Sequence, residues 1–236
     1  MPGKLYLIPT PLDTSRPLDY SQPEEVGRII ARLRHYVVEE LRSARRFISS
    51  CHRGVVIDDL SFSVLNEHTR AEEIESMLAP VDAGFDLGLM SEAGVPGVAD
   101  PGAELVAVAH RRGIEVVPLV GASSIIMSLM ASGLTGQTFT FNGYLPVKDD
   151  ARRSAIVRME RMAVTEGYTQ IFIEAPYRND KLLAVLLKTL APTTKLTVAR
   201  NITSPEESIK TDTVAGWRKK STPLIGKVPT IFLIGR

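Results

Sequence analysis

Twelve residues from Ser91 to Gly102, with the sequence SEAGVPGVADPG, combine features that suit the binding of a small ligand. The glycines in this segment allow unusual backbone angles and a close approach of main-chain amides to a ligand. The segment carries Glu92 and Asp100 but no basic residue, which disfavours a phosphate group and suits a ligand that offers hydroxyl groups or a positive charge. Its glycine spacing matches neither a dinucleotide-binding loop nor a phosphate-binding loop.

The position of this loop also favours a binding role. An apolar run at residues 85–90 predicts a strand before it, and the apolar spacing at 102–112 predicts a helix after it. In open α/β sheets, ligands bind at the carboxyl ends of the strands, where such loops lie. The residues alone leave one alternative open, a tight connection that uses glycine and proline only to turn the chain.

Short β-rich runs alternate with helix-length segments along the whole chain, which predicts βαβ units and mainly parallel sheets. Runs that are apolar on both faces, at 114–119 and 230–235, predict sheets covered by helices on both sides. Thr69 and Glu72 form the pattern of a capping box, which predicts a helix start near Arg70. Further strands are predicted at residues 4–8, 138–145, 168–175, 195–201 and 228–235, and further helices at residues 122–133, 149–166 and 179–191.

The composition bounds the class of protein. The chain has 236 residues, of which 44% are hydrophobic, enough for packed cores in one large or two small domains. Because the net charge is only +1, a nucleic acid would have to be held by a local basic patch. Interspersed acids leave the alternative that each candidate patch is simply a charged, solvent-exposed helix face. The candidate patches are Arg42, Arg45 and Arg46, then Arg152, Arg153, Arg158 and Arg161, and finally Arg218, Lys219 and Lys220.

The sequence holds no apolar run long enough for a membrane span and no signal-peptide layout at its start, so we expect a soluble protein with no membrane partner. Cys51 is the only cysteine, which excludes an internal disulfide and points to the cytoplasm. We expect no metal because the histidines, at positions 35, 52, 68 and 110, lack the spacing of metal ligands.

The loop at 91–102 closely resembles the Ser-Asp-Ala-Gly-Thr-Pro-Gly-Ile-Ser-Asp-Pro-Gly loop of bacterial methyltransferases that modify a ribose 2′-hydroxyl of small-subunit ribosomal RNA. Those enzymes belong to the tetrapyrrole methylase superfamily and use S-adenosylmethionine. On this resemblance the chain is identified as a member of the superfamily, with the ribosomal RNA enzymes as its nearest group. Further segments resemble the family in the same order: LYLIPTPL, VVPLVGASSIIMSLMASGL, FTFNGYLPVKDDARRSAI, IFIEAPYRNDKLLAVL and LTVARNITSPEES.

The resemblance implies two α/β domains, residues 1–119 and 120–236, with mainly parallel sheets, the second one mixed, and a cofactor cleft between them. It also implies a homodimer and S-adenosylmethionine as the cofactor. This cofactor offers a ribose diol and a sulfonium cation, which agrees with an acidic loop that lacks lysines. Carried over residue by residue, the cofactor contacts are expected from Pro11, Ser91, Glu92, Val95, Ser123, Ser124, Ala175, Ile202 and Pro229. Without the resemblance, the paired serines would be helix caps and the last three would be core or turn residues.

Two segments depart from the ribosomal RNA enzymes. Their first loop continues as Thr-Pro-Ile-Gly-Asn where this chain has TPLDT at 10–14, and their Glu-Asp-Thr-Arg motif appears as EELR at 39–42. Because both segments lie toward the acceptor side in the family, we expect an intact donor site and an altered acceptor site. Apolar spacing alone predicts one long helix within 24–50, whereas the alignment predicts a helix, a strand at 35–40 and a second helix. We follow the alignment, because Val37 and Val38 fit a buried strand equally well.

The sulfonium methyl group is already activated, so the protein mainly has to align donor and acceptor and to exclude water. A hydroxyl acceptor must also lose its proton, and Glu39, Glu40 and Glu174 are the candidate catalytic bases. Three functions stay open. They are methyl transfer to ribosomal RNA, the same transfer to a protein or to a small molecule such as a tetrapyrrole, and cofactor binding without turnover.

Overall fold

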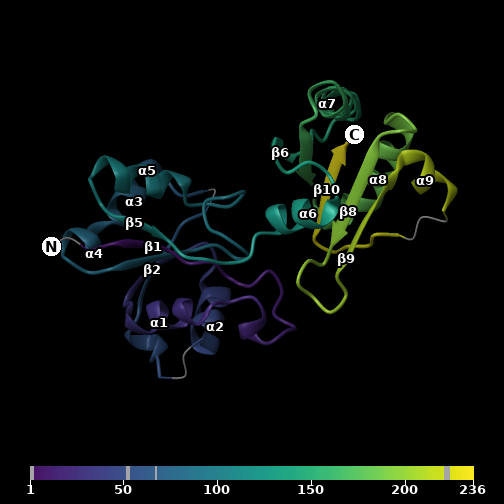
Figure 1. The fold of residues 1–236 in the computed structure, drawn as a ribbon. Coiled ribbons are helices and arrows are strands. Elements are labelled where there is room, and N and C mark those ends of the chain that lie inside the picture. Colours follow the sequence, from purple (N-terminus) through teal and green to yellow (C-terminus); the bar gives the residue numbers. More distant parts are fainter. Residues whose placement is uncertain (1–2, 52–53, 67, 221–223) are drawn as a thin grey trace. The chain divides into compact units, whose positions relative to one another are not determined.

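The computed structural model describes residues 3–51, 54–66, 68–220 and 224–236. The chain divides into two compact units, Met1–Ser123 and Ser124–Arg236 (Figure 1). This division lies close to the predicted boundary at residues 119 and 120. Within the described residues, each unit is built on one five-stranded sheet.

The sheet of the first unit is parallel throughout, with the strand order β3-β2-β4-β1-β5. Parallel neighbours need crossover connections, and helices supply them here. The strands are β1 (Leu5–Leu7), β2 (His35–Val38), β3 (Ser61–Val64), β4 (Leu87–Met90) and β5 (Val116–Pro118). The helices are α1 (Glu24–Arg32), α2 (Leu41–Cys51), α3 (Ala71–Ser76), α4 (Ala79–Asp82) and α5 (Ala103–Arg111).

Helices cover both faces of this sheet (Figure 1), as the apolar runs predict. Helices α1 and α2 pack on one face through a cluster that includes Ile30 and Ile48. Helices α3, α4 and α5 pack on the other face through a cluster that includes Leu78 and Leu105. The central strand β4 is buried along its length, so its carboxyl end presents the glycine-rich loop from a rigid position.

The segment from 24 to 51 forms a helix, a strand and a second helix, which confirms the prediction from the alignment and rules out the one long helix that apolar spacing alone indicates. Val37 and Val38 are completely buried in β2, between β3 and β4. β-Branched side chains lose rotamer freedom in a helix and pack well in a sheet, which favours the strand here.

The sheet of the second unit is mixed, with the strand order β6-β7-β10-β8-β9. β6 runs parallel to β7, and the other neighbours are antiparallel. The strands are β6 (Phe139–Tyr144), β7 (Thr169–Ile173), β8 (Lys195–Arg200), β9 (Ser208–Thr213) and β10 (Thr230–Gly235). The helices are α6 (Ser124–Ser132), α7 (Asp149–Arg161), α8 (Asn179–Thr189) and α9 (Val214–Lys219).

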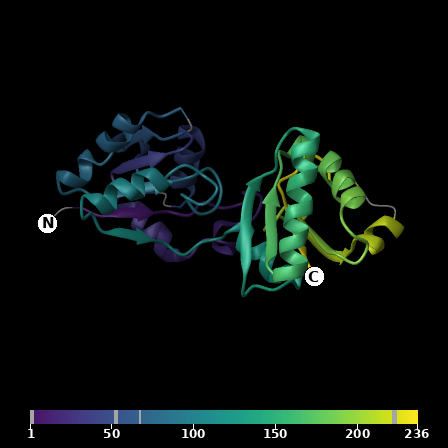
Figure 2. The same ribbon diagram turned by 90° about the horizontal axis from the view of Figure 1, so that it is seen from above.

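Helices α7, α8 and α9 share one face of this sheet, and α7 and α8 are the neighbouring green helices in Figure 2. Helix α6 lies on the opposite face against β9 and β10, where the Thr211 hydroxyl donates to the Ser132 carbonyl at 2.7 Å. The core contains stacked Phe172 and Phe232 rings with 5.7 Å between centroids. The predicted architecture of two α/β domains, with a mixed second sheet, is therefore confirmed.

Two details differ from the sequence-based expectations. Helix α3 begins at Ala71, next to Arg70 as expected, but the predicted capping box does not form. The Thr69 hydroxyl accepts a hydrogen bond from the Asn66 amide at 3.0 Å instead of capping the helix. In addition, β3 and β9 were not predicted, and both are edge strands. Among the described residues, no helix has both the length and the apolar character that a membrane span requires.

Candidate functional site

The glycine-rich loop leaves β4 and enters α5 with its three glycines, Gly94, Gly97 and Gly102, at positive φ, which glycine adopts more easily than other residues. Gly94 has φ +90°, and a Cβ atom there would lie 3.2 Å from Cδ2 of Leu12. Gly102 has φ +131°, and its Cβ atom would lie 2.8 Å from Cδ2 of Leu89. Because L side chains are strained at these angles, the loop holds its main chain where a larger residue would displace it.

The proline-rich loop after β1 lies against this glycine-rich loop. Thr10 and Gly94 exchange two main-chain hydrogen bonds, of 2.8 and 3.1 Å between N and O. The Thr10 hydroxyl also donates to the Ser91 carbonyl at 3.3 Å. These bonds bring together two residues predicted to bind the cofactor, the buried Pro11 and the buried Ser91.

Three carboxylates gather around the loop. The Glu92 amide donates to the carboxylate of Glu39, which follows β2. Burial raises the pKa of Asp100 to about 6 against the influence of the Ser91 hydroxyl, and the charges of Glu39 and Glu92 raise it further. The carboxylates thus act on one another, which gives the loop a negative field that favours cationic or hydroxyl-bearing ligands.

A cavity of about 690 Å³ lies beside the loop within the first unit. Its walls come from the segment 10–19, from helix α2 and from the start of the glycine-rich loop. Three predicted cofactor residues line it, namely Pro11, Ser91 and Glu92. Arg16 and Arg46 also line it, so the cavity joins the acidic loop to a basic wall.

In the second unit, the sheet register brings Ala175, Ile202 and Pro229 to one edge. β7 and β8 end where β10 begins, with Ile173 opposite Ile231 and Arg200 opposite Thr230. The Asn201 amide donates to the Pro229 carbonyl at 3.0 Å. The Asn179 side chain, at the start of α8, donates to the Val228 carbonyl at 2.8 Å and ties the Ala175 turn to the same edge.

The residues on either side of Ile202 adopt left-handed backbone angles, with φ 52° at Asn201 and φ 73° at Thr203. A β-branched residue is rare in this region, and such strain is concentrated at functional sites. Thr203 is 3% exposed, and its hydroxyl has no hydrogen-bond partner among the described residues. Thr203 is not among the residues predicted from the sequence to bind the cofactor, although it lies in the segment LTVARNITSPEES that resembles the family.

The remaining predicted cofactor residues occupy ordinary positions. Val95 is half-buried within the glycine-rich loop. Ser123 and Ser124 are half-buried at the start of α6, where the carbonyl of Ser124 accepts a hydrogen bond from the Ser128 hydroxyl.

The three candidate bases have different surroundings. Glu174 is buried and its Oε1 accepts from Arg178 Nη2 at 2.6 Å, so this carboxylate is held in an ion pair. Glu40 is exposed and caps α2, and hydrogen bonds, chiefly from the Ser43 amide, lower its pKa. Glu39 is half-buried and directly bonded to the glycine-rich loop, which makes it the candidate best placed for proton transfer there.

The proposed basic patches are only partly available to a nucleic acid. Arg152 is 3% exposed and paired with Asp149, so its inclusion in a surface patch is wrong. Arg218 donates to the carbonyls of Leu187 and Leu190 and thereby caps the end of α8. Within the described part of the chain, no three His, Cys, Asp or Glu side chains are placed to hold a metal ion, and His52 lies outside that part.

Comparison with known proteins agrees with this arrangement. The family model described as Tetrapyrrole (Corrin/Porphyrin) Methylases matches residues 26–216. The Ribosomal RNA small subunit methyltransferase I of a Synechocystis species is 33% identical over 205 residues, which cover 87% of this chain and 69% of that protein. The protein of the same name from Xylella fastidiosa is 33% identical over 214 residues, covering 91% and 74%.

Solved structures share the fold. The methyltransferase CobJ has a TM-score of 0.65 at 17% identity and covers 99% of this chain and 94% of its own. Uroporphyrin-III C-methyl transferase from Thermus thermophilus, complexed with S-adenyl homocysteine, has a TM-score of 0.58 at 15% identity and covers 99% and 98%. With a family match over most of its length, curated relatives at 33% identity and the expected two-unit fold, this chain is a methyltransferase that belongs to the tetrapyrrole (corrin/porphyrin) methylase family.

Proposed function

We propose that this protein transfers the methyl group of S-adenosylmethionine to a ribose 2′-hydroxyl of small-subunit ribosomal RNA. The observation that carries the proposal is the acidic, glycine-rich loop, which brings the carboxylates of Glu39, Glu92 and Asp100 close enough to act on one another. Such a field suits a sulfonium cation and a ribose diol. The relatives named as small-subunit ribosomal RNA methyltransferases support the choice of RNA.

In this proposal the first unit binds the donor through Pro11, Ser91, Glu92 and Val95, and the start of α6 contributes Ser123 and Ser124. The second unit contributes the strand-end group of Ala175, Ile202 and Pro229, whose main-chain geometry is fixed by the sheet register. Because these main-chain positions are already fixed before binding, less conformational entropy is lost when the ligand binds.

The reaction needs alignment and one proton transfer. Bound S-adenosylmethionine supplies a methyl group on a cationic sulfur, whose C–S bond breaks as the acceptor oxygen bonds the methyl carbon. Glu39 takes the hydroxyl proton, since its carboxylate is already oriented by the Glu92 amide at 3.0 Å. Arg16 and Arg46, on the cavity wall next to this loop, contact the phosphates that flank the acceptor ribose.

We also propose a cytoplasmic homodimer. Helix α6 exposes 79% of Met130 and 45% of Ile126, and a second copy of the chain would cover these apolar side chains. Cys51 is the only cysteine in the sequence, so the chain holds no internal disulfide, as suits a protein of a reducing compartment. Light scattering of the purified protein, beside a Met130→Asp variant, tests the dimer.

The test of function is label transfer from methyl-labelled S-adenosylmethionine into separated cell fractions. Label in small-subunit ribosomal RNA at an alkali-resistant nucleotide supports the proposal, because a 2′-O-methyl group blocks cleavage of that phosphodiester. Label in a small molecule or in protein identifies a different acceptor, which is the main alternative because the acceptor-side segments differ from the family. If calorimetry shows that the cofactor binds but no label is transferred, the protein binds the cofactor without turnover. If the cofactor does not bind, the proposed donor site is wrong.

A further inference from the structure

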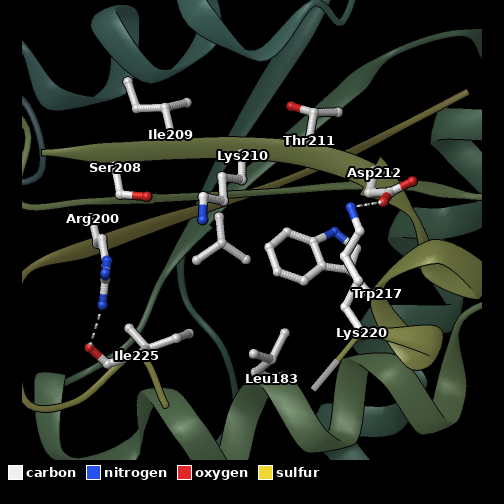
Figure 3. A pocket seen from close by; sticks show the side chains of 11 residues that line it. Leu183, Arg200, Ser208, Ile209, Lys210, Thr211, Asp212, Trp217, Lys220 and Ile225 are labelled. Carbon is white, nitrogen blue, oxygen red and sulfur yellow. Dashed lines mark hydrogen bonds and ion pairs between the residues drawn. The ribbon is translucent and has the colours of Figure 1, made fainter. Parts of the chain in front are cut away.

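A second cavity, of about 450 Å³, lies within the second unit between the strands β8 and β9 and the helices α8 and α9 (Figure 3). None of the nine proposed cofactor residues lines it. Its walls come from the sheet face that carries Val198 and from Trp217 of the helix α9 that covers this face, and Arg200 at the end of β8 closes one side. The cavity is therefore lined by residues other than those proposed to bind the methyl donor.

Apolar side chains form the floor of this cavity. Leu183, Val198, Trp217 and Ile225 line it, and each belongs to the hydrophobic core cluster of the unit. The indole nitrogen of Trp217 donates to the Leu196 carbonyl at 2.8 Å, which fixes the ring edge and leaves the ring toward the cavity (Figure 3). A ligand with an apolar body would displace water from these walls and gain hydrophobic stabilisation.

Cations form the rim. Lys220 lies 2.7 Å from Asp212, so this pair is neutral as a unit. Arg200 and Lys210 have no carboxylate within ion-pair distance among the residues that the structure describes. The Arg200 side chain donates a hydrogen bond of 3.5 Å to the Ile225 carbonyl. In Figure 3 the Lys210 side chain reaches into the cavity between Arg200 and Trp217. The rim thus carries two uncompensated positive charges above an apolar floor.

We propose that this cavity is a binding site for a small organic anion, in which an apolar ring or chain lies against Trp217 and an anionic group lies between Arg200 and Lys210. The charge of the rim selects the anion, and the floor selects the apolar body. Lys210 stands directly opposite Val198 in the β8–β9 register, which places the charged and apolar recognition groups on the same sheet face.

The test uses 2-naphthoate as the probe and 2-naphthalenemethanol as its neutral analogue, with the whole chain in solution. Trp217 is the only tryptophan of the protein, so quenching of intrinsic fluorescence reports on this cavity directly. We expect saturable quenching by naphthoate, and affinity about tenfold lower in Lys210→Met and in Arg200→Met, the loss typical of one charged hydrogen bond. The neutral analogue is expected to bind at least as weakly as naphthoate binds the variants.

Lys195→Met is the matched control, because Lys195 is an exposed lysine of β8 that does not line the cavity. This variant is expected to bind naphthoate as the unchanged protein does. Circular dichroism checks that each variant is folded. The proposal would be overturned by absence of quenching, by a neutral analogue that binds as tightly as naphthoate, or by Lys210→Met and Arg200→Met variants that bind naphthoate as tightly as the unchanged protein. None of these results depends on methyl transfer.

Discussion

The main-chain amide of Glu92 donates a hydrogen bond to the carboxylate of Glu39, with 3.0 Å between N and Oε2. The Glu39 amide in turn donates to the Met90 carbonyl at 3.2 Å. Residues that follow two neighbouring parallel strands, β2 and β4, are thereby locked together at the sheet's carboxyl edge. A candidate base and the donor loop consequently share one rigid support.

Glu39→Gln is expected to lower the rate of methyl transfer roughly a hundredfold, because the amide oxygen still accepts the Glu92 hydrogen bond but the side chain cannot take a proton. Donor affinity should change little. Single-turnover transfer and calorimetry measure the two quantities. Glu40→Gln, which alters only the exposed helix cap, serves as the control. Full activity of Glu39→Gln would remove Glu39 from the reaction.

Gly94→Ala is expected to weaken donor binding strongly, because the positive φ and the nearby Leu12 side chain force the loop to move. Gly113→Ala is the control for backbone strain, since Gly113 has φ +69° and open space around its missing Cβ atom. Each variant should lose about 1 kcal/mol of unfolding free energy from the left-handed angle. Equal donor affinity in the two variants would contradict the role of the loop.

The raised pKa of Asp100 leads us to expect that donor binding depends on pH. Burial raises its pKa to about 6, so the carboxyl ionises as the pH rises through that value. A sulfonium cation gains from this ionisation, and its affinity should increase between pH 5 and 7, about one unit on either side of that pKa. The Asp100→Asn variant should lose this increase, as measured by calorimetry at both pH values.

The same group affects stability with the opposite sign. Because the folded-state pKa of Asp100 is raised, the folded protein holds this proton more tightly than the unfolded chain does. Stability from this group is therefore present below about pH 4 and is lost as the pH rises through about 6. The difference in unfolding midpoint between the unchanged protein and Asp100→Asn, followed across this range, checks the sign.

Arg178→Ala is expected to destabilise the protein by about 3 kcal/mol, because it leaves the buried Glu174 carboxylate without its ion-pair partner. The matched control is Lys4→Ala, which breaks the exposed ion pair with Glu115 at 2.8 Å and should have little effect. Denaturant unfolding measures both. A loss of unfolding free energy in Arg178→Ala no larger than in Lys4→Ala would contradict a stabilising ion pair between Arg178 and Glu174.

Arg46→Ala is expected to weaken binding to ribosomal RNA fragments and to reduce the slope of log affinity against log salt by about one. Arg111→Ala is the control, because Arg111 is an exposed arginine on the opposite helix layer, paired with Glu75. Equal slopes for the two variants would remove the cavity wall from the RNA interface.

Much of the fold could be predicted because most strands of the two sheets are continuous apolar runs between clear turns. Of the four edge strands in the described sheets, two escaped prediction because their sequences, SFSV in β3 and SIKTDT in β9, are polar and largely exposed or half-exposed. The capping prediction at Thr69 was wrong because a threonine hydroxyl can also accept a hydrogen bond from the main chain of the preceding turn, as it does here from the Asn66 amide. Local patterns do not distinguish these two uses.

The site was less accessible to prediction. Glu174 directly follows the strand β7, and in sequence nothing distinguishes it from a free acid, whereas the structure shows its ion pair with Arg178. The grouping of Ala175, Ile202 and Pro229 depends on antiparallel pairing with β10, which no local pattern encodes. The strained angle of Thr203 likewise arises from the tight turn after β8, and a threonine gives no sign of it in sequence.

The central place of β10 determines how the protein withstands truncation. β7 and β8 are joined only through residues 230–235, so a chain that stops before Thr230 is left with two separate strand pairs in its second unit. The first unit closes its sheet with β5 at Pro118. We therefore expect the first unit to fold during synthesis before the second unit, whose sheet is completed only by its last strand. A premature stop near the end of the chain should leave the second unit unfolded and open to proteolysis.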